Sequence, residues 1–198
     1  MSTATVQRER TVHHIAESAQ ENPYHRPSFS FKHRLVRVVW QVTYLLLYRL
    51  SPTPLYGWRA MLLRLFGAKV GAGCHFYPSG KVWAPWNLIC EDLVTAGDGA
   101  EIYNPAPVHL GSHAILSQNS YICGAAYDFD DLALPLRTYY MEVGAYAWIC
   151  ARASICPGVR VGEGAVLGLG STATCYLEPW GVYAGTPAVK VKDRKRVR

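Results

Sequence analysis

A six-residue repeat constrains this chain more than any other feature of its sequence. From residue 143, a small or aliphatic residue leads each of six hexads: Val143, Ile149, Ile155, Val161, Leu167 and Ala173. A second small or branched residue follows four places after the first five leads: Ala147, Ala153, Val159, Ala165 and Ser171. Helices repeat near 3.6 residues and strands at 2, so neither gives a clean period of six. Three six-residue faces per turn do, and the repeat therefore predicts an all-β solenoid, a parallel β-helix with coils of about eighteen residues.

The same phase extends upstream of residue 143, with two interruptions. Two earlier sets of leads are Cys90, Ala96 and Ile102, then Leu110, Leu116 and Ile122. A less regular start lies at Val70, Phe76 and Val82. Two extra residues separate Ile102 from Leu110, and fifteen, 128–142, follow the Ile122 hexad. A repeat can serve stability alone, but loops inserted into a strict solenoid commonly build its binding face.

The chain before the repeat predicts two helices. Residues 31–50 read as one helix that is too short and too charged to cross a bilayer, which needs about 20 apolar residues. Pro52 and Pro54 end it, and a second short helix is expected over 55–66. We expect the helices to cap the open end of the β-helix, whose strand edges are otherwise exposed. A second reading makes 31–50 a basic amphipathic segment that lies on a membrane, and the two roles can coexist.

These patterns divide the chain into four parts. Residues 1–28 are polar and carry no signal-peptide apolar region, so we expect a flexible arm. Residues 29–67 form the helical segment, and residues 68–188 form the left-handed β-helix domain with its loop 128–142. Residues 189–198 form a basic tail, which is either a solvated terminus or a contact for an anionic partner.

Composition excludes several classes of function. The 198 residues are 50% hydrophobic, which suits one domain with a real core, and the net charge is +6. No nucleic-acid recognition motif accompanies this charge, so we expect no nucleic-acid partner. The six cysteines show neither metal-ligand spacing nor a compact disulfide framework. We therefore expect no metal, reduced thiols and a cytoplasmic protein, with peripheral contact at the inner membrane face left open.

Five segments carry a resemblance to a known family. They are LLLYRLSPTPLYGWRAMLLRLFGAKVG (45–71), YPSGKVWAPWNL (77–88), IYNPAPVHLGSHAILSQNSYIC (102–123), PGVRVGEGAVLGLGS (157–171) and PWGVYAGTPAVKV (179–191). With them the chain resembles the hexapeptide-repeat acyltransferases, and within these the sugar O-acetyltransferases of the colanic-acid-biosynthesis type. The resemblance implies a left-handed parallel β-helix and a homotrimer with active sites at the subunit interfaces. It also implies acetyl-CoA as co-substrate and a sugar hydroxyl as acceptor.

The chain departs from this family at the catalytic position. Relatives carry His-Asp shortly after a cysteine-containing strand, whereas this chain reads Tyr127-Asp128. The family histidine takes the proton from the acceptor hydroxyl, a task suited to a base with a pKa near neutrality. Tyrosine ordinarily titrates near pH 10 and is a poor base at neutral pH. The resemblance therefore predicts the fold more firmly than it predicts catalysis.

The coil length suggests a substitute base. Residues eighteen apart stack on successive coils, about 4.8 Å from each other, which places Tyr127 on His109. Glu142, where the long loop returns, is expected at the same corner. The column continues at Arg160 and Glu178. We hypothesise that His109 acts as base or ligand contact and that Glu142 or Asp128 orients it; the alternative is an ordinary outward-facing histidine.

The resemblance also suggests binding residues. Acceptor contacts are expected at Tyr103, Asn104, Phe129 and Tyr139, although Asn104 also suits a turn and the loop 128–142 could instead hold the trimer together. Acetyl-CoA contacts are expected at Ala151, Gly168, Gly170, Ser171, Thr186, Pro187, Lys190 and Lys192. The two lysines would lie near the phosphates.

Two classes of function follow from these observations. The first is an acyl-CoA-dependent O-acetyltransferase that acts on a sugar hydroxyl in polysaccharide or glycan biosynthesis. The second is a catalytically inactive trimeric homologue that serves as a scaffold or ligand-binding protein. Tyr127 favours the second class, whereas the retained insertions and the intact GTPA segment (185–188) favour the first.

Overall fold

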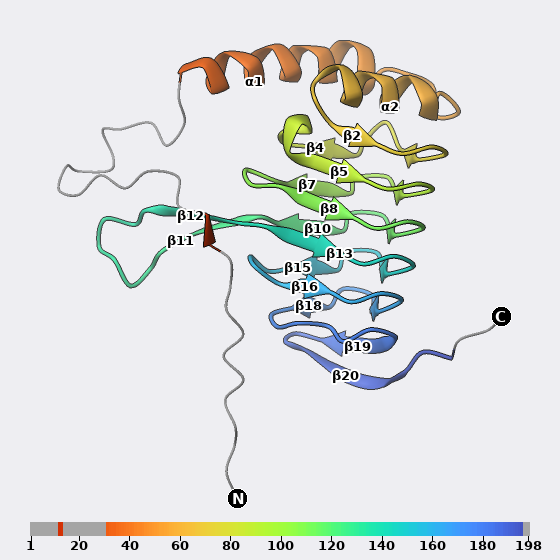
Figure 1. The fold of residues 1–198 in the computed structure, drawn as a ribbon, viewed down its shortest axis with the longest axis vertical. Coiled ribbons are helices and arrows are strands. Elements are labelled where there is room, and N and C mark those ends of the chain that lie inside the picture. The colour runs from red at the N-terminus through yellow and green to blue at the C-terminus, as the bar shows by residue number, and fades with distance from the viewer. Residues whose placement is uncertain (1–11, 14–30, 196–198) are drawn as a thin grey trace, which may run out of the picture.

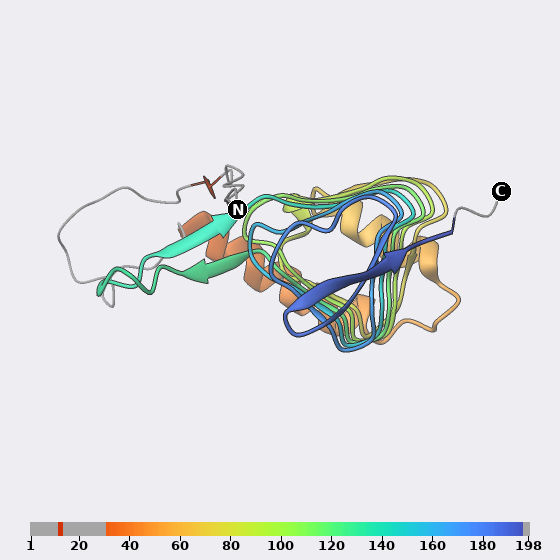
Figure 2. The ribbon, with the colours of Figure 1, turned by 90° about the horizontal axis from the view of Figure 1, so that it is seen from below.

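A three-sided left-handed β-helix of about six coils forms the body of the protein (Figure 1). The computed structural model describes residues 12–13 and 31–195, so most of the arm expected over 1–28 lies outside the described residues. Along the prism the strands of each face pair in parallel with those of the coils before and after. Figure 2 looks along the stacked coils and shows the triangular outline. The fold predicted from the repeat is confirmed.

Three parallel sheets make the faces of the prism. Face 1 contains β2 (Lys69–Val70), β5 (Leu88–Cys90), β8 (Val108–Leu110), β13 (Met141–Val143) and β16 (Arg160–Val161). Face 2 contains β3 (His75–Phe76), β6 (Thr95–Ala96), β9 (Ile115–Leu116), β14 (Trp148–Ile149), β17 (Val166–Leu167), β19 (Gly181–Gly185) and β20 (Ala188–Asp193). Face 3 contains β4 (Lys81–Val82), β7 (Glu101–Tyr103), β10 (Tyr121–Cys123), β15 (Ser154–Ile155) and β18 (Thr172–Ala173). A short 3₁₀ helix, η3 (Pro85–Asn87), turns the first coil from face 3 to face 1.

The repeat works because its two apolar positions fill the prism and its corners. Every hexad lead from Phe76 to Ala173 is buried. The small residues at the fourth step, such as Ala114 and Ala147, are buried too, except Ala126, which is half-buried. Stacked side chains of this kind give one continuous core that no single coil could bury alone. Register is offset by twenty residues in the early coils, as in Ile89 with His109, and by eighteen in the later ones, as in Glu142 with Arg160.

Left-handed backbone recurs where face 1 turns into face 2. At this corner Leu93, His113, Tyr146 and Trp180 have φ between 58° and 61°. Glycine would adopt this conformation without strain, so the side chains at these positions are held there by the coil geometry. The His113 and Tyr146 rings use it to stack, with centroids 4.6 Å apart.

Two helices cover the first end of the prism. Helix α1 (Phe31–Thr43) continues into a π-helical turn, η2 (Tyr44–Tyr48), and α2 (Tyr56–Leu65) follows after a short linker. Trp40 and Tyr48 are buried against the first coils, and the Trp40 indole N–H donates to the Val82 carbonyl at 2.8 Å. The expected cap is therefore present, and Figure 1 shows it across the end opposite β20. No helix within residues 31–195 is long and apolar enough to cross a membrane.

A buried arginine fastens this cap to the prism. The Arg59 guanidinium donates to the Phe76 carbonyl, to the Ser51 hydroxyl and to the carbonyls of Pro52 and Thr53. These bonds satisfy a charged group that burial would otherwise penalise. The linker between the helices is thus tied both to α2 and to the first coil.

Two hairpins depart from the regular coils. Between β10 and β13 the chain leaves the prism as β11 (Ala125–Tyr127) and β12 (Leu136–Tyr139), whose outer edge pairs with β1 (Val12–His13). At the other end, β19 and β20 pair antiparallel and close the last coil. Residues 189–193 of the segment expected as a basic tail therefore belong to a strand.

Candidate active site

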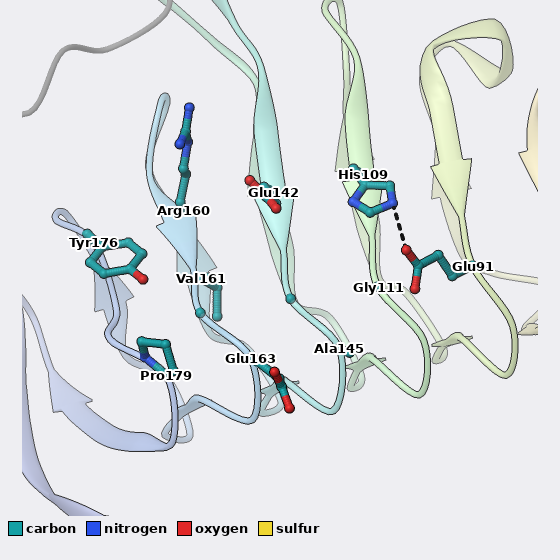
Figure 3. A pocket seen from close by; sticks show the side chains of 12 residues that line it. Glu91, His109, Gly111, Glu142, Ala145, Arg160, Val161, Glu163, Tyr176 and Pro179 are labelled. Atoms are coloured by element: carbon teal, nitrogen blue, oxygen red, sulfur yellow. Dashed lines mark ion pairs between the residues drawn. The ribbon is translucent and has the colours of Figure 1, made fainter.

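An open groove runs along face 1 near its corner with face 2. It has a volume of about 390 Å³ and crosses strands β8, β13 and β16 (Figure 3). Its lining includes Glu91, His109, Glu142, Arg160, Glu163 and Tyr176. The groove floor is backbone, because Gly111, Gly144 and Gly162 stand where each coil passes the next. A Cβ on Gly144 would lie 2.6 Å from the Glu163 amide nitrogen, so this floor admits no side chain.

His109 is held in the groove by a glutamate from the preceding coil. Its Nε2 lies 3.3 Å from Glu91 Oε1, and the His109 side chain is only 26% exposed. The other Glu91 oxygen accepts from the Ser112 amide at 2.9 Å and from the Ser112 hydroxyl at 2.8 Å. The pKa of Glu91 is lowered, first by the Ser112 hydroxyl, then by the Ser112 amide, with a smaller contribution from His109. Glu91 is therefore an anion at neutral pH, placed to fix the tautomer of the imidazole.

The predicted column is present in part. His109 pairs in register with Glu142, and Glu142 with Arg160, so these three side chains stand on successive strands of the groove. The predicted stacking of Tyr127 on His109 is wrong. The chain has already left the prism at Ala125, so Tyr127 pairs with Leu136 in the hairpin and Glu142 takes the next place in the column. Glu178 is also outside the column, since the last coil is shorter and Leu177 pairs with Val161.

Asp128 is engaged within the hairpin. Its Oδ2 accepts from Arg137 Nε at 2.7 Å, with the terminal guanidinium nitrogen at 2.5 Å. The hydrogen bond from Arg137 lowers the pKa of Asp128. Because Asp128 braces the hairpin, the expectation that Asp128 orients His109 is wrong. Glu142 stands in register with His109 on the next strand, and Glu91 is the carboxylate that contacts the His109 ring.

Tyr127 lies at the base of the hairpin, beside an aromatic cluster on face 3. Its side chain is 61% exposed, and its electrostatic influence reaches Tyr103, whose pKa is raised mainly by burial. The Tyr103 ring packs edge-on against Trp83 at 5.4 Å, and the Arg37 guanidinium lies 4.0 Å above the Trp83 ring. Aromatic faces of this kind suit a sugar ring.

The other expected acceptor residues differ in what they can offer. Asn104 is fully buried, and its amide bonds both the N–H and the carbonyl of Ala84 at 2.9 and 2.8 Å. Its side chain is thus a link between coils and cannot reach an acceptor, because no polar group is left exposed. Phe129 projects from the hairpin tip, whereas Tyr139 packs against the core and donates its amide to Gly124.

Most residues expected to contact acetyl-CoA lie together at the corner between faces 2 and 3. The Gly170 amide donates to the Ala151 carbonyl at 3.0 Å, and the Ser171 amide donates to the Gly168 carbonyl. The Ser171 hydroxyl accepts from the Gly185 amide at 3.0 Å, which brings the Thr186–Pro187 turn alongside. Thr186 and Pro187 are joined by a cis peptide bond.

The two lysines that are expected to contact the phosphates differ in their surroundings. Lys190 forms ion pairs with Glu178 at 3.1 Å and with Asp193 at 2.9 Å, and its pKa is raised, chiefly by Asp193 and then by Glu178. Two carboxylates already offset this charge, which makes Lys190 a weaker phosphate partner. Lys192 is exposed on β20, in register with Val182.

The structure thus gathers the expected residues into separate clusters. His109 and Glu142 share the face 1 groove, and Tyr127 and Asp128 share the hairpin between faces 3 and 1. Most of the acetyl-CoA set lies at another corner, between faces 2 and 3. Glu91 is a site residue that the eighteen-residue spacing does not predict, because the early coils are offset by twenty residues, which places Glu91 beside Gly111 and Ser112. The eighteen-residue spacing used for His109 applies only to later coils.

Prism, extruded hairpin and glycine-floored groove together define a protein of the hexapeptide-repeat β-helix class. Solved structures of low sequence identity share this fold. A hexapeptide-repeat acetyltransferase from Vibrio cholerae, complexed with acetyl coenzyme A, matches with a TM-score of 0.75 at 18% identity, over 87% of this chain and 94% of that one. A galactoside acetyltransferase in complex with coenzyme A matches with a TM-score of 0.75 at 19% identity, over 85% and 86%.

Sequence similarity narrows the class to a family. The putative colanic acid biosynthesis acetyltransferase WcaF of Escherichia coli is 33% identical over 156 residues, which cover 79% of this chain and 86% of that protein. No model of a known protein family matches the sequence. The chain belongs to the hexapeptide-repeat acetyltransferase family that includes WcaF.

Proposed function

We propose that this protein transfers an acetyl group from acetyl-CoA to a sugar hydroxyl in polysaccharide biosynthesis. The observation that carries the proposal is the WcaF likeness over most of both chains, together with a groove that holds an oriented histidine. Structural neighbours bind coenzyme A or its acetyl ester on the same fold. The thioester supplies the leaving group, so the protein's task is to position the hydroxyl and take its proton.

His109 is our candidate for the general base. With Nε2–H donating to Glu91, the other ring nitrogen, Nδ1, keeps its lone pair. Figure 3 shows this nitrogen on the edge of the ring towards Glu142. Nδ1 would take the hydroxyl proton as the oxygen attacks the thioester carbonyl. The C–S bond then breaks, and the departing thiolate recovers the proton from His109.

The active enzyme in this proposal is a homotrimer. Within one chain the acetyl-CoA cluster lies at the corner between faces 2 and 3, whereas the His109 groove lies on face 1, so a single chain does not bring them together. A neighbouring subunit would supply the second half of each site.

The first test is a calorimetric titration of the full-length protein with acetyl-CoA, with CoA as control. We expect binding near one site per chain at micromolar concentration, because family structures carry this ligand. Heat indistinguishable from dilution at millimolar ligand, in a correctly assembled protein, would favour the catalytically inactive homologue.

The second test asks whether His109 or residue 127 occupies the position of the base. It measures thiol release from acetyl-CoA with a panel of galactosides and oligosaccharides as acceptors. His109→Ala is expected to lower kcat by about 10²-fold or more with little change in acetyl-CoA affinity, the usual loss for a general base. His113→Asn is the matched control, because Asn tolerates the left-handed backbone of His113. Undiminished turnover in His109→Ala would remove His109 from the mechanism. A rise in Tyr127→His alone would then assign the base position to residue 127.

A further inference from the structure

The outward face of the helical cap is apolar, the reverse of an ordinary surface helix. A single stripe of aliphatic and aromatic side chains faces solvent along α1 and η2, each between 49% and 75% exposed: Phe31, Leu35, Val38, Val39, Val42, Leu45 and Leu46. Their spacing of three and four residues keeps them on one side of the helix. The opposite side, with Trp40, Tyr44 and Tyr48, packs on the prism.

Helix α2 extends the same apolar surface. Trp58, Met61 and Leu65 are exposed, while Leu62 and Leu63 face inward. The Trp58 indole N–H donates to the Leu47 carbonyl at 2.9 Å, which joins α2 to η2. Together with the Arg59 bonds, this contact holds the two helices as one surface, which we call the apolar platform: residues 31–50 and 55–65.

The charged side chains of the platform helices themselves are all cations. No aspartate or glutamate occurs from residue 22 to residue 90. Lys32, Arg34, Arg49 and Arg64 are exposed on the same helices. An exposed apolar stripe on helices that carry only cations matches the layered chemistry of an anionic bilayer, with acyl chains beneath phosphate head groups.

We propose that the apolar platform lies in the surface of an anionic lipid bilayer. A second copy of the platform is a poorer occupant, because a symmetric contact would bring the same cations face to face. The helices lie flat across the end of the prism (Figure 1), which is the orientation of an interfacial helix rather than of a spanning one. The prism axis then points away from the membrane, with the β19–β20 end farthest from it. This inference rests on the helices alone and is independent of acetyl transfer.

Flotation with lipid vesicles tests the proposal on the full-length protein. Vesicles of phosphatidylcholine with phosphatidylglycerol should carry the protein upward, and those of phosphatidylcholine alone should bind at least about tenfold less. High salt should weaken binding, since it screens the cations. Protein that remains at the bottom with anionic vesicles would overturn the proposal.

A matched pair of variants locates the contact. Leu35→Gln/Val39→Gln/Leu46→Gln removes three exposed side chains of the platform without touching the buried face, and should reduce flotation by about tenfold or more. Ile115→Gln/Val189→Gln/Val191→Gln removes three exposed apolar side chains elsewhere and should float like the wild type. Circular dichroism checks that both fold.

Equal flotation of the two variants would overturn the assignment of the surface. Light scattering on the same samples measures the particle mass and so tests the alternative occupant, a second copy of the platform. If the platform variant lowers the particle mass and the wild type does not bind vesicles, the platform is an interface between protein chains instead.

Discussion

The His109–Glu91–Ser112 chain is the most specific arrangement at the residue scale. Ser112 gives Glu91 two hydrogen bonds, and Glu91 in turn faces the His109 ring. If Glu91 only positions the histidine, its loss should slow the reaction without abolishing it. We expect Glu91→Gln to lower kcat by about tenfold, less than His109→Ala, with the KM for acetyl-CoA unchanged.

Urea unfolding distinguishes positioning from general structural damage in that variant. Glu91→Gln should lower kcat in samples whose folded fraction matches that of the wild type. A loss of kcat that follows a loss of folded protein would mean that Glu91 acts on the fold and not on His109.

Glu91 also makes stability depend on pH. Because its folded pKa is lowered, its contribution is present above its unfolded pKa and is lost as the pH falls through the folded value. Ser112→Ala removes the hydroxyl bond, so its stability deficit should be larger at about pH 7 than at about pH 3. Urea unfolding at the two values measures this, and an equal deficit at both would contradict the role of the carboxylate.

At the scale of elements, Asn104 links two corners of the prism. Its amide bonds both backbone polar groups of Ala84, which is completely buried. Asn104→Ala leaves the Ala84 N–H without this partner, whereas the Ala84 carbonyl still accepts from the Asn87 amide. We expect a loss of about 1–3 kcal/mol in the free energy of unfolding. Gln118→Ala, on an exposed corner, should change it by less than about 0.5 kcal/mol. Unchanged stability with a raised KM for the acceptor would return Asn104 to the binding site.

The elements that the sequence predicted are those whose signal is periodic. Leads such as Leu110 and Ile149 are buried where the six-residue repeat places them, because each must fill the same position in the core. The exit of the hairpin was misplaced because Ala126 keeps the phase of the repeat after the chain has left the prism. The six-residue period therefore predicts the faces of the prism, but it does not predict the residue at which the chain leaves a face.

The helix α1 gives a second example of the same physical limit. Its stripe is visible in the sequence, but a pattern cannot say which side faces the core. The aromatic side packs inward because the Trp40 indole N–H donates a hydrogen bond to the Val82 carbonyl. The aliphatic stripe remains exposed to solvent. Glu91 was missed for a related reason, since the offset between coils depends on corner insertions that only the folded chain reveals.

At the scale of the whole molecule, the hairpin tip exposes large apolar side chains that a neighbouring subunit would bury. Phe129 and Leu132 are 84% and 99% exposed and project beyond the prism. We expect the wild type to have three times the mass of the 22.0 kDa chain by light scattering, and Phe129→Ser/Leu132→Ser to shift towards a lighter species. A trimer that persists while the KM for the acceptor rises would instead make the tip a cover over the acceptor.

The hairpin has a consequence for how such proteins diversify. Strand β13 resumes the register of β8 after the excursion, and β15 pairs with β10 as though no residues intervened. The packing of the core therefore does not depend on the length or the sequence of the hairpin. Insertions, deletions and recombination in this segment therefore have little effect on folding. A lineage built on this prism can therefore vary one projecting surface segment while its scaffold stays the same.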